Sequence, residues 1–220
     1  MFDAQLMEML AEGVWDTLYM TIVSTGLSYL FGIPVGVLLV ICRKGGIAPR
    51  PLLYAVLDVV VNLTRSFPFL ILMIAVIPFT RFLVGTTIGN NATVVPLVIA
   101  AVPFVGRLIE SSLLEVDAGV VEAAQSMGAS DWQIITKVLL PEALPSLLNG
   151  SAVAAITILG YSAMSGAVGG GGLGKLAIMY GYNRYQTDIM FITIILLIII
   201  VQLFQMLGNW ATKRSDKRVS

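Results

Sequence analysis

Residues 117–141, DAGVVEAAQSMGASDWQIITKVLLP, separate two strongly apolar segments and combine charge with helical periodicity. Four residues recur at helical spacing and form one small, mostly apolar face: Val120, Ala123, Ala124 and Met127. Gly128 is expected to end this first helix, because glycine enters the left-handed conformation without a Cβ penalty. Ser130 and Gln133 predict a capping box for a second helix, which runs until Pro141 closes it or opens the next one. Such a helix pair cannot bury its apolar face alone, so the stretch predicts a protein partner.

The same stretch contains a motif with defined spacing. The motif residues are Glu122, Ala123, Ala124, Gly128, Leu140 and Pro141. Their order and spacing resemble the E-A-A-x3-G…L-P motif of permease subunits of bacterial ABC importers. In that family the motif forms the coupling helix, which sits in a cleft of the cytoplasmic ATPase, so the resemblance implies the same role here. The alternative is an ordinary helix in a cytoplasmic loop, since E-A-A is common in helices.

The composition indicates an integral membrane protein. The chain is 57% hydrophobic and only 12% charged, with a mean hydropathy of +0.91, whereas soluble domains carry roughly 25% charged residues. Zero net charge without histidine gives no basis for nucleic-acid binding and excludes imidazole catalysis and imidazole metal ligation. Cys42 is the only cysteine, so neither a disulfide nor a cysteine metal site is expected. The length suits one membrane domain over 1–220, without room for an ATPase domain.

Hydropathy predicts an all-α membrane protein with five spans, at about 18–42, 59–83, 94–110, 143–168 and 188–210. The second span is expected to belong to one continuous helical stretch over 52–83, interrupted at 66–68 before its apolar core. Basic residues gather in 43–50, 107–137 and 213–218, the last including Lys217 and Arg218. By the positive-inside rule, the N-terminus is then outside and the C-terminus inside. Residues 1–13 contain no basic residue, so a cleaved signal peptide is not expected.

Two patterns indicate contacts of the first and third spans. Gly32 and Gly36 either let a neighbouring helix approach closely or absorb a kink at Pro34. Arg107 and Glu110 stand three residues apart near the cytoplasmic face, where they can pair or extend to the interface.

A glycine-rich segment at 169–175, GGGGLGK, matches the spacing of a phosphate-binding loop. Leu176 stands where serine or threonine must hold magnesium, no strand precedes the loop, and the topology places it outside. The segment is therefore expected to be a flexible turn that folds back into the external mouth.

Polar side chains within the spans are candidates for a translocation pathway, since they are costly in a bilayer unless they face partners or a cavity. These candidates are Asn62, Arg65, Asn149, Tyr161 and Ser162. Hydrogen bonding between helices is the alternative, and it is the stronger explanation for serine. Met164, near the outer end of the fourth span, is a candidate gate, because its unbranched side chain can repack between two conformations. Ordinary interhelical packing explains Met164 equally well.

Three further segments resemble one subfamily of these importer permeases. RSFPF at 65–69, PEALP at 141–145 and GYSAMSGAVG at 160–169 are similar to the permease of the bacterial methionine ABC importer. This similarity implies a type I ABC importer permease fold and a homodimer in the bacterial inner membrane. It further implies two cytoplasmic ATPase subunits that bind ATP and magnesium, and an external methionine-binding lipoprotein. The chain itself would hold no cofactor and no catalytic residue, and would move D- or L-methionine by alternating access.

Other functions remain open beside this one. The first is an ABC permease for another small amino acid. The second is an autonomous secondary transporter, which usually shows intramembrane ionisable residues and internal repeats. Arg65 is the one ionisable residue expected near membrane depth, and no internal repeat is evident. A membrane scaffold would not need so polar a fourth span.

Overall fold

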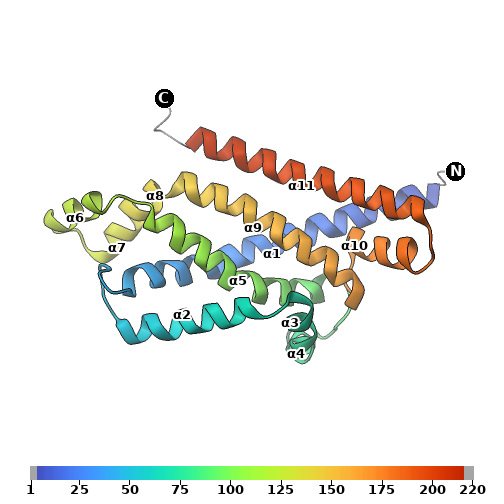
Figure 1. Cartoon of the computed structure of the whole chain (residues 1–220), viewed down its shortest axis with the longest axis horizontal. Coiled ribbons are helices and arrows are strands. Elements are labelled where there is room, and N and C mark those ends of the chain that lie inside the picture. The colour runs from blue at the N-terminus through green and yellow to red at the C-terminus, as the bar shows by residue number, and fades with distance from the viewer. Residues whose placement is uncertain (1–3, 216–220) are drawn as a thin grey trace. The chain divides into compact units, whose positions relative to one another are not determined.

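The computed structural model describes residues 4–215, which are helical apart from turns and short connections. The longer helices are α1 (Ala4–Cys42), α2 (Pro51–Ser66), α5 (Asn90–Leu114), α9 (Leu144–Ser165) and α11 (Thr187–Ser215) (Figure 1). The shorter ones are α3 (Phe69–Ala75), α4 (Ile77–Val84), α6 (Ala118–Ser126), α7 (Asp131–Ile134), α8 (Leu140–Glu142) and α10 (Gly172–Leu176). Single π-helical segments cover Ile135–Leu139 and Ala177–Tyr182, and a 3₁₀ turn covers Gly166–Val168. Lys217 and Arg218 of the predicted cytoplasmic tail lie outside the described residues.

Four helical segments within residues 4–215 are long and apolar enough to cross a bilayer: Ala4–Cys42, Asn90–Leu114, Leu144–Tyr182 and Thr187–Ser215. A fifth crossing is obtained if the bent pair α2 and α3 is counted as one span. Helix α1 has 39 residues. At 1.5 Å per residue its length is roughly 58 Å, against about 30 Å for the hydrocarbon core. Part of α1 therefore extends beyond the hydrocarbon region.

The second apolar segment is not one continuous helix. Phe67 and Pro68 separate α2 from α3, and this confirms the interruption that the sequence predicts at 66–68. Pro68 has no N–H to donate, and the residue before a proline is pushed out of the α-helical region. A new helix starts at this point, where the amides of Ile71 and Leu72 both donate to the Pro68 carbonyl at 3.0 Å. A second break at Val76 separates α3 from α4, so the prediction that the helix runs unbroken from 69 to 83 is wrong.

The chain divides into two structural units. Among the described residues, unit 1 comprises 4–27, 67–101 and 154–206. Unit 2 comprises 28–66, 102–153 and 207–215. Helices α1, α5, α9 and α11 each contribute residues to both units.

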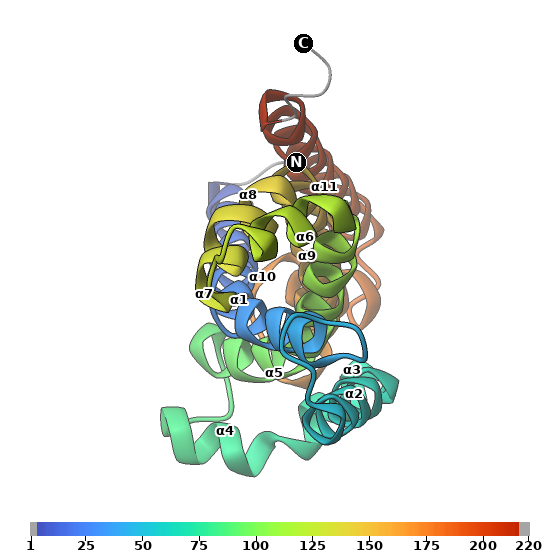
Figure 2. The same cartoon turned by 90° about the vertical axis from the view of Figure 1, so that its left-hand side faces the viewer.

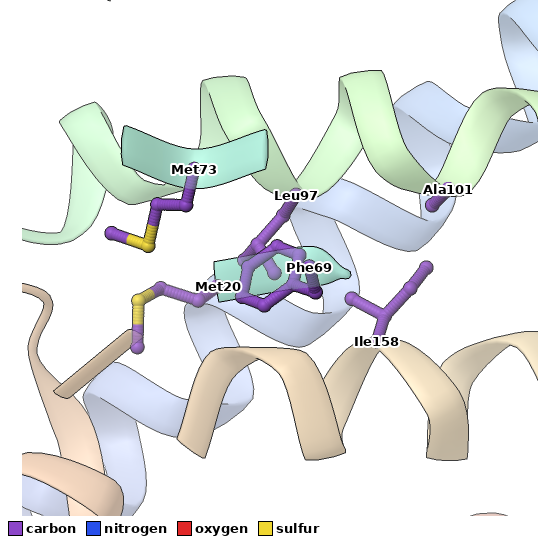
Figure 3. Close-up of a cluster of buried hydrophobic side chains, with 6 residues drawn as sticks. All are labelled: Met20, Phe69, Met73, Leu97, Ala101 and Ile158. Atoms are coloured by element: carbon purple, nitrogen blue, oxygen red, sulfur yellow. The ribbon is translucent and has the colours of Figure 1, made fainter. Parts of the chain in front are cut away.

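Unit 1 contains two clusters of buried apolar side chains. The first gathers side chains from α1, α3, α5 and α9 around the ring of Phe69 (Figure 3). Its buried members are Met20, Phe69, Met73, Leu97, Ala101 and Ile158. The second cluster packs the N-terminal part of α1 against α9, α10 and α11. Its buried members are Leu10, Leu159, Leu173, Leu176 and Ile200.

The glycine-rich segment is a packed structure rather than the flexible turn that the sequence predicts. Gly169 and Gly172 adopt positive φ angles of +94° and +79°, which reverse the chain after α9. Gly174 lies directly against the backbone of Ala163, where no side chain would fit. The Leu173 amide donates to Thr17 Oγ1 at 2.9 Å and ties α10 to α1. The missing side chains thus allow close backbone packing, and the buried turn does not have the flexibility expected from its composition.

Unit 2 contains a close contact between α1 and α5. A Cβ atom on Gly32 would stand 2.7 Å from Val105 Cγ1, and one on Gly36 would stand 2.7 Å from the Gly106 carbonyl oxygen. Helix α1 continues through Pro34 to Cys42. The glycine pair therefore serves close helix packing, which is one of the two alternatives for this motif.

Candidate functional site

Residues 117–141 of unit 2, named the coupling segment after their motif, have the local geometry that their sequence predicts. Helix α6 ends in a Schellman motif at Gly128, whose φ is +80°. The Gly128 amide bonds to the Gln125 carbonyl at 2.9 Å, and the Ala129 amide bonds to the Ala124 carbonyl at 3.1 Å. The capping box of α7 is present, with both reciprocal bonds between Ser130 and Gln133. The helix–corner–helix prediction is confirmed.

One face of this segment is exposed and the other is anchored. No residue of α6 is buried. Met127 is 88% exposed and Trp132 is 72% exposed, which is unusual for side chains of their size. On the opposite side Ile134 and Leu139 are buried. Figure 2 shows α6 and α7 next to each other at one end of unit 2, with α8 nearby. The segment therefore presents apolar side chains on a base fixed within its own unit.

Pro141 opens α8 and does not end the helical path. The Leu140 amide reaches back five residues to the Ile135 carbonyl, which produces the π-helical turn just before the proline. Such a turn accommodates the missing proline N–H. Ala143 is buried, and its amide bonds to the Leu139 carbonyl at 3.0 Å. A helical path with one turn, at Ala143, therefore links α7 and α8 to α9.

A pocket of about 210 Å³ lies against α6. Glu122 and Gln125 line it from α6, and Arg43 lines it from the loop that follows α1. The Arg43 Nε atom is buried and has no hydrogen-bond partner among the described residues. The N-terminal amide of α6 is capped by Asp117, whose Oδ1 accepts from Gly119 N at 2.6 Å. Glu122 is therefore not the capping group of α6, and its carboxylate is exposed toward this pocket.

A polar network links α2 and α5 in unit 2. Arg107 donates to Glu110 Oε2 at 2.6 Å, as the sequence spacing predicts, and also to Asp58. Its Nη2 atom donates to Asn62 Oδ1 at 3.0 Å, and Asn62 Nδ2 donates to Asp58 at 3.2 Å. The spacing of four residues places Asp58 and Asn62 on one helix face, but the sequence does not predict the ion pair of Asp58 with Arg107. Asn62 thus has partners within its unit.

The two other polar candidates in unit 2 are exposed. Arg65 forms no ion pair with any residue in 4–215 and is exposed. Asn149 is exposed and borders a pocket of about 350 Å³ that is also lined by Ser112 and Ser146. The hydroxyl groups of these two serines are 3.0 Å apart and hydrogen-bonded.

The three candidates in unit 1 have different environments. Tyr161 stacks on Phe69, with ring centroids 4.6 Å apart and an interplanar angle of 7°. Ser162 is buried, and its hydroxyl donates to the Leu159 carbonyl at 2.8 Å, which satisfies it within its own helix. Met164 is 53% exposed in the single chain. Sequence spacing alone could not have indicated the Tyr161–Phe69 stack, because the two residues are distant in the chain.

Comparison with known protein families identifies the family of this chain. Residues 32–220 match the model of the family described as the binding-protein-dependent transport system inner membrane component. The chain belongs to this family. The permease is accordingly an inner-membrane component of a transporter and not an enzyme.

Curated relatives resemble the permease over most of its length. A protein of Vibrio cholerae named "Probable D-methionine transport system permease protein MetI" is 51% identical over 211 residues, covering 96% of this chain and 94% of the relative. The D-methionine transport system permease protein MetI of Escherichia coli strain K12 is 50% identical over 161 residues, covering 73% and 74%.

Solved structures share the fold. A chain of the MetNI methionine ABC transporter in an inward-facing conformation has a TM-score of 0.97 and 46% identity, covering 98% of the permease and 100% of that chain. A chain from an amino acid ABC transporter with histidines has a TM-score of 0.78 at 20% identity, covering 97% and 99%, and shows the fold alone. The permease has the type I ABC importer permease fold, which the sequence predicted.

Proposed function

We propose that this permease is the membrane subunit of an ATP-driven importer of methionine. It works as a homodimer with two cytoplasmic ATPase subunits, which bind ATP and magnesium. An external methionine-binding lipoprotein delivers the substrate. The observation that carries this proposal is the similarity to D-methionine permeases, at 51% identity over nearly the whole length, supported by the TM-score of 0.97 to the methionine transporter chain.

The coupling segment provides the physical link to the ATPase. Glu122, Ala123 and Ala124 lie on the exposed helix α6, and Gly128 forms the corner beside the exposed Met127. An isolated apolar surface of this kind indicates a protein partner. The small alanine side chains let a partner cleft approach the helix closely. Leu140 and Pro141 continue the helical path into α9, so movement of the coupling segment is transmitted to that helix.

Alternating access then requires no covalent chemistry from the permease. Closure of the ATPase pair brings the two coupling segments together, closes the inner mouth and opens the outer one. We assign Met164 to the gate, supported by its half-exposed side chain at the outer end of α9, where a second copy can cover it. Tyr161, Ser162, Asn149, Asn62 and Arg65 remain proposed pathway residues. Among them, the internal hydrogen bond of Ser162 favours a packing role.

Reconstitution tests this function directly. The permease is placed in liposomes with its ATPase subunit, and uptake of radiolabelled L- and D-methionine is measured with the binding protein outside. Uptake is expected only with ATP and is expected to be reduced by unlabelled methionine. If another small amino acid reduces the uptake and unlabelled methionine does not, the substrate is that amino acid. Uptake without ATP and ATPase would indicate a secondary transporter.

A further inference from the structure

Unit 1 contains an open pocket of about 420 Å³ that none of the proposed pathway residues lines. Trp15, Asp16 and Tyr19 of α1 form one wall. The opposite wall is formed by the turn that precedes α5 and by Asn90 and Asn91 at the start of that helix. The N-terminal part of α1 precedes the predicted first span, and the positive-inside rule places it outside. A soluble external partner can therefore reach this pocket.

The walls of the pocket are held in place by contacts within unit 1. The Tyr19 hydroxyl donates to Asn91 Oδ1 at 2.8 Å and joins α1 to α5. The Gly89 amide donates to the Gly169 carbonyl at 3.0 Å and fixes the turn. A Cβ atom on Gly171 would lie 3.1 Å from Asp16 Oδ2, so the carboxylate packs closely against the glycine backbone. The pocket therefore presents a carboxylate at a defined position.

The chemistry of the pocket suits an ammonium group. Trp15 and Tyr19 stand four residues apart on one face of α1, on either side of Asp16 in the sequence. Aromatic faces attract cations, and a carboxylate pairs with an ammonium by charge-assisted hydrogen bonds. Asp16 forms no ion pair with any residue in 4–215. Exposed carboxylates of Glu8 and Glu12 continue the acidic side of α1 at the same spacing of four residues.

We propose that this pocket receives a lysine side chain of the external binding protein. The proposal rests on the proposed function, because it requires an importer whose substrate arrives on a separate protein. The family is itself defined by dependence on a binding protein. Charge complementarity favours a basic edge of that partner, and rim charges of this kind mainly set the rate and the salt dependence of association. An aromatic side chain that only anchors the helix at the membrane surface would show no such dependence on charge.

Zero-length cross-linking gives the direct test. The assembled transporter in lipid nanodiscs is mixed with the lipid-free methionine-binding protein and a water-soluble carbodiimide. The reagent activates a carboxylate, a lysine amine displaces the urea by-product, and an amide bond joins the two proteins. Mass spectrometry is expected to find Asp16 joined to a lysine of the binding protein. Asp16→Asn should abolish this product, whereas Asp188→Asn, which removes an exposed carboxylate at the start of α11, should leave it intact.

Stimulation of ATP hydrolysis by the binding protein gives a second readout. Asp16→Asn and Trp15→Leu should each raise the half-saturating concentration of binding protein about tenfold, and Asp16→Asn, which removes the charge, should also weaken its salt dependence. Asp188→Asn should match the wild type. The docking proposal would be overturned if the Asp16→Asn variant needed the same half-saturating concentration of binding protein as the wild type and the wild type gave no cross-link at Asp16. This holds even if Trp15→Leu fails to insert.

The two proposals fail differently. If the docking site is wrong, wild-type permease still imports methionine and the variants behave like it. If the methionine function is wrong, wild-type permease itself shows no methionine uptake with this binding protein.

Discussion

At the residue scale, Gly128 has the strictest backbone requirement in the coupling segment. Its φ of +80° belongs to a region that branched side chains avoid. A Cβ atom there would meet nothing within 4 Å in this chain. A substitution at this position therefore acts through the backbone or through a bound partner, because the chain itself leaves space.

Gly128→Val should leave the permease inserted and dimeric but abolish transport and weaken its hold on the ATPase. The positive φ would cost valine about 1–3 kcal/mol, which displaces the corner from its docked position. Co-purification of the ATPase and methionine uptake measure the effect. Gly128→Asn is the matched control, since asparagine tolerates this conformation, and it should retain most activity. Normal ATPase binding and import by Gly128→Val would contradict the proposed role.

Arg107 is the second residue with a specific requirement. It forms ion pairs with two carboxylates, those of Asp58 and Glu110, and its side chain is only 20% exposed. Removal of the cation leaves both carboxylates without their ion-pair partner in a partly buried position, and this is more costly than the loss of a surface pair.

Arg107→Leu should lower stability by about 3 kcal/mol, which corresponds to a fall in the unfolding midpoint of roughly 6–12 °C for a chain of this size. Thermal unfolding in detergent measures this. Asp58→Asn alone should cost less, because Asn62 and Arg107 can still bond to the amide. Combining it with Arg107→Leu should cost less than the two separate effects added together, whereas strict additivity would show that the pair is not coupled.

At the scale of elements, α7, the π-helical turn and α8 lead through a turn at Ala143 into α9, and α6 lies beyond the Gly128 corner with an exposed face. Helix α6 has no buried residue, so its apolar face is free for a partner. Gln125 and Glu122 turn toward the pocket beside Arg43, which is a different side from the apolar face.

Ala124→Trp should block docking by steric exclusion, with loss of ATPase co-purification and of methionine uptake. Gln125→Ala is the neighbouring control and should be mild, because it removes no group from the proposed contact face. Equal behaviour of the two variants would show that the apolar face of α6 does not enter the ATPase cleft.

The outer end of α9 holds the proposed gate. Met164 is half exposed, whereas Ser162 and Ser165 beside it are buried and bonded to carbonyl groups of their own helix. The polar residues at this level therefore support the helix, and the methionine is available to a second copy.

Met164→Ala should raise ATP hydrolysis that is not coupled to transport, or allow methionine to leak across the membrane. Both are measured in proteoliposomes, with Met179→Ala, another exposed methionine of unit 1, as the control. If ATP hydrolysis stays coupled to methionine transport in Met164→Ala, the role of Met164 is ordinary packing between helices.

At the scale of the whole molecule, orientation in the membrane determines which surfaces meet which partners. A cysteine at Asn90 should react with an impermeant thiol reagent in intact cells, and one at Ser215 should not. The natural Cys42 is only 2% exposed, so its background reaction is expected to be small. Thr86, which is more exposed in the turn before α5, gives a second external position. The reverse labelling pattern would overturn the topology.

The sequence by itself determined the features that depend on local periodicity. Helices, the Gly128 corner, the capping box at Ser130 and the Arg107–Glu110 pair all follow from residues a few positions apart, and the structure has each of them. The motif also sufficed to find the family. Only the tertiary structure decided the burial of the glycine turn, the Tyr161–Phe69 stack and the link from Asp58 to Arg107. These features arise between residues that are distant in the chain, or depend on space left by neighbouring helices. A local sequence pattern does not indicate which distant surface will pack into that space. For this reason the pocket around Asp16 could be identified only in the folded chain.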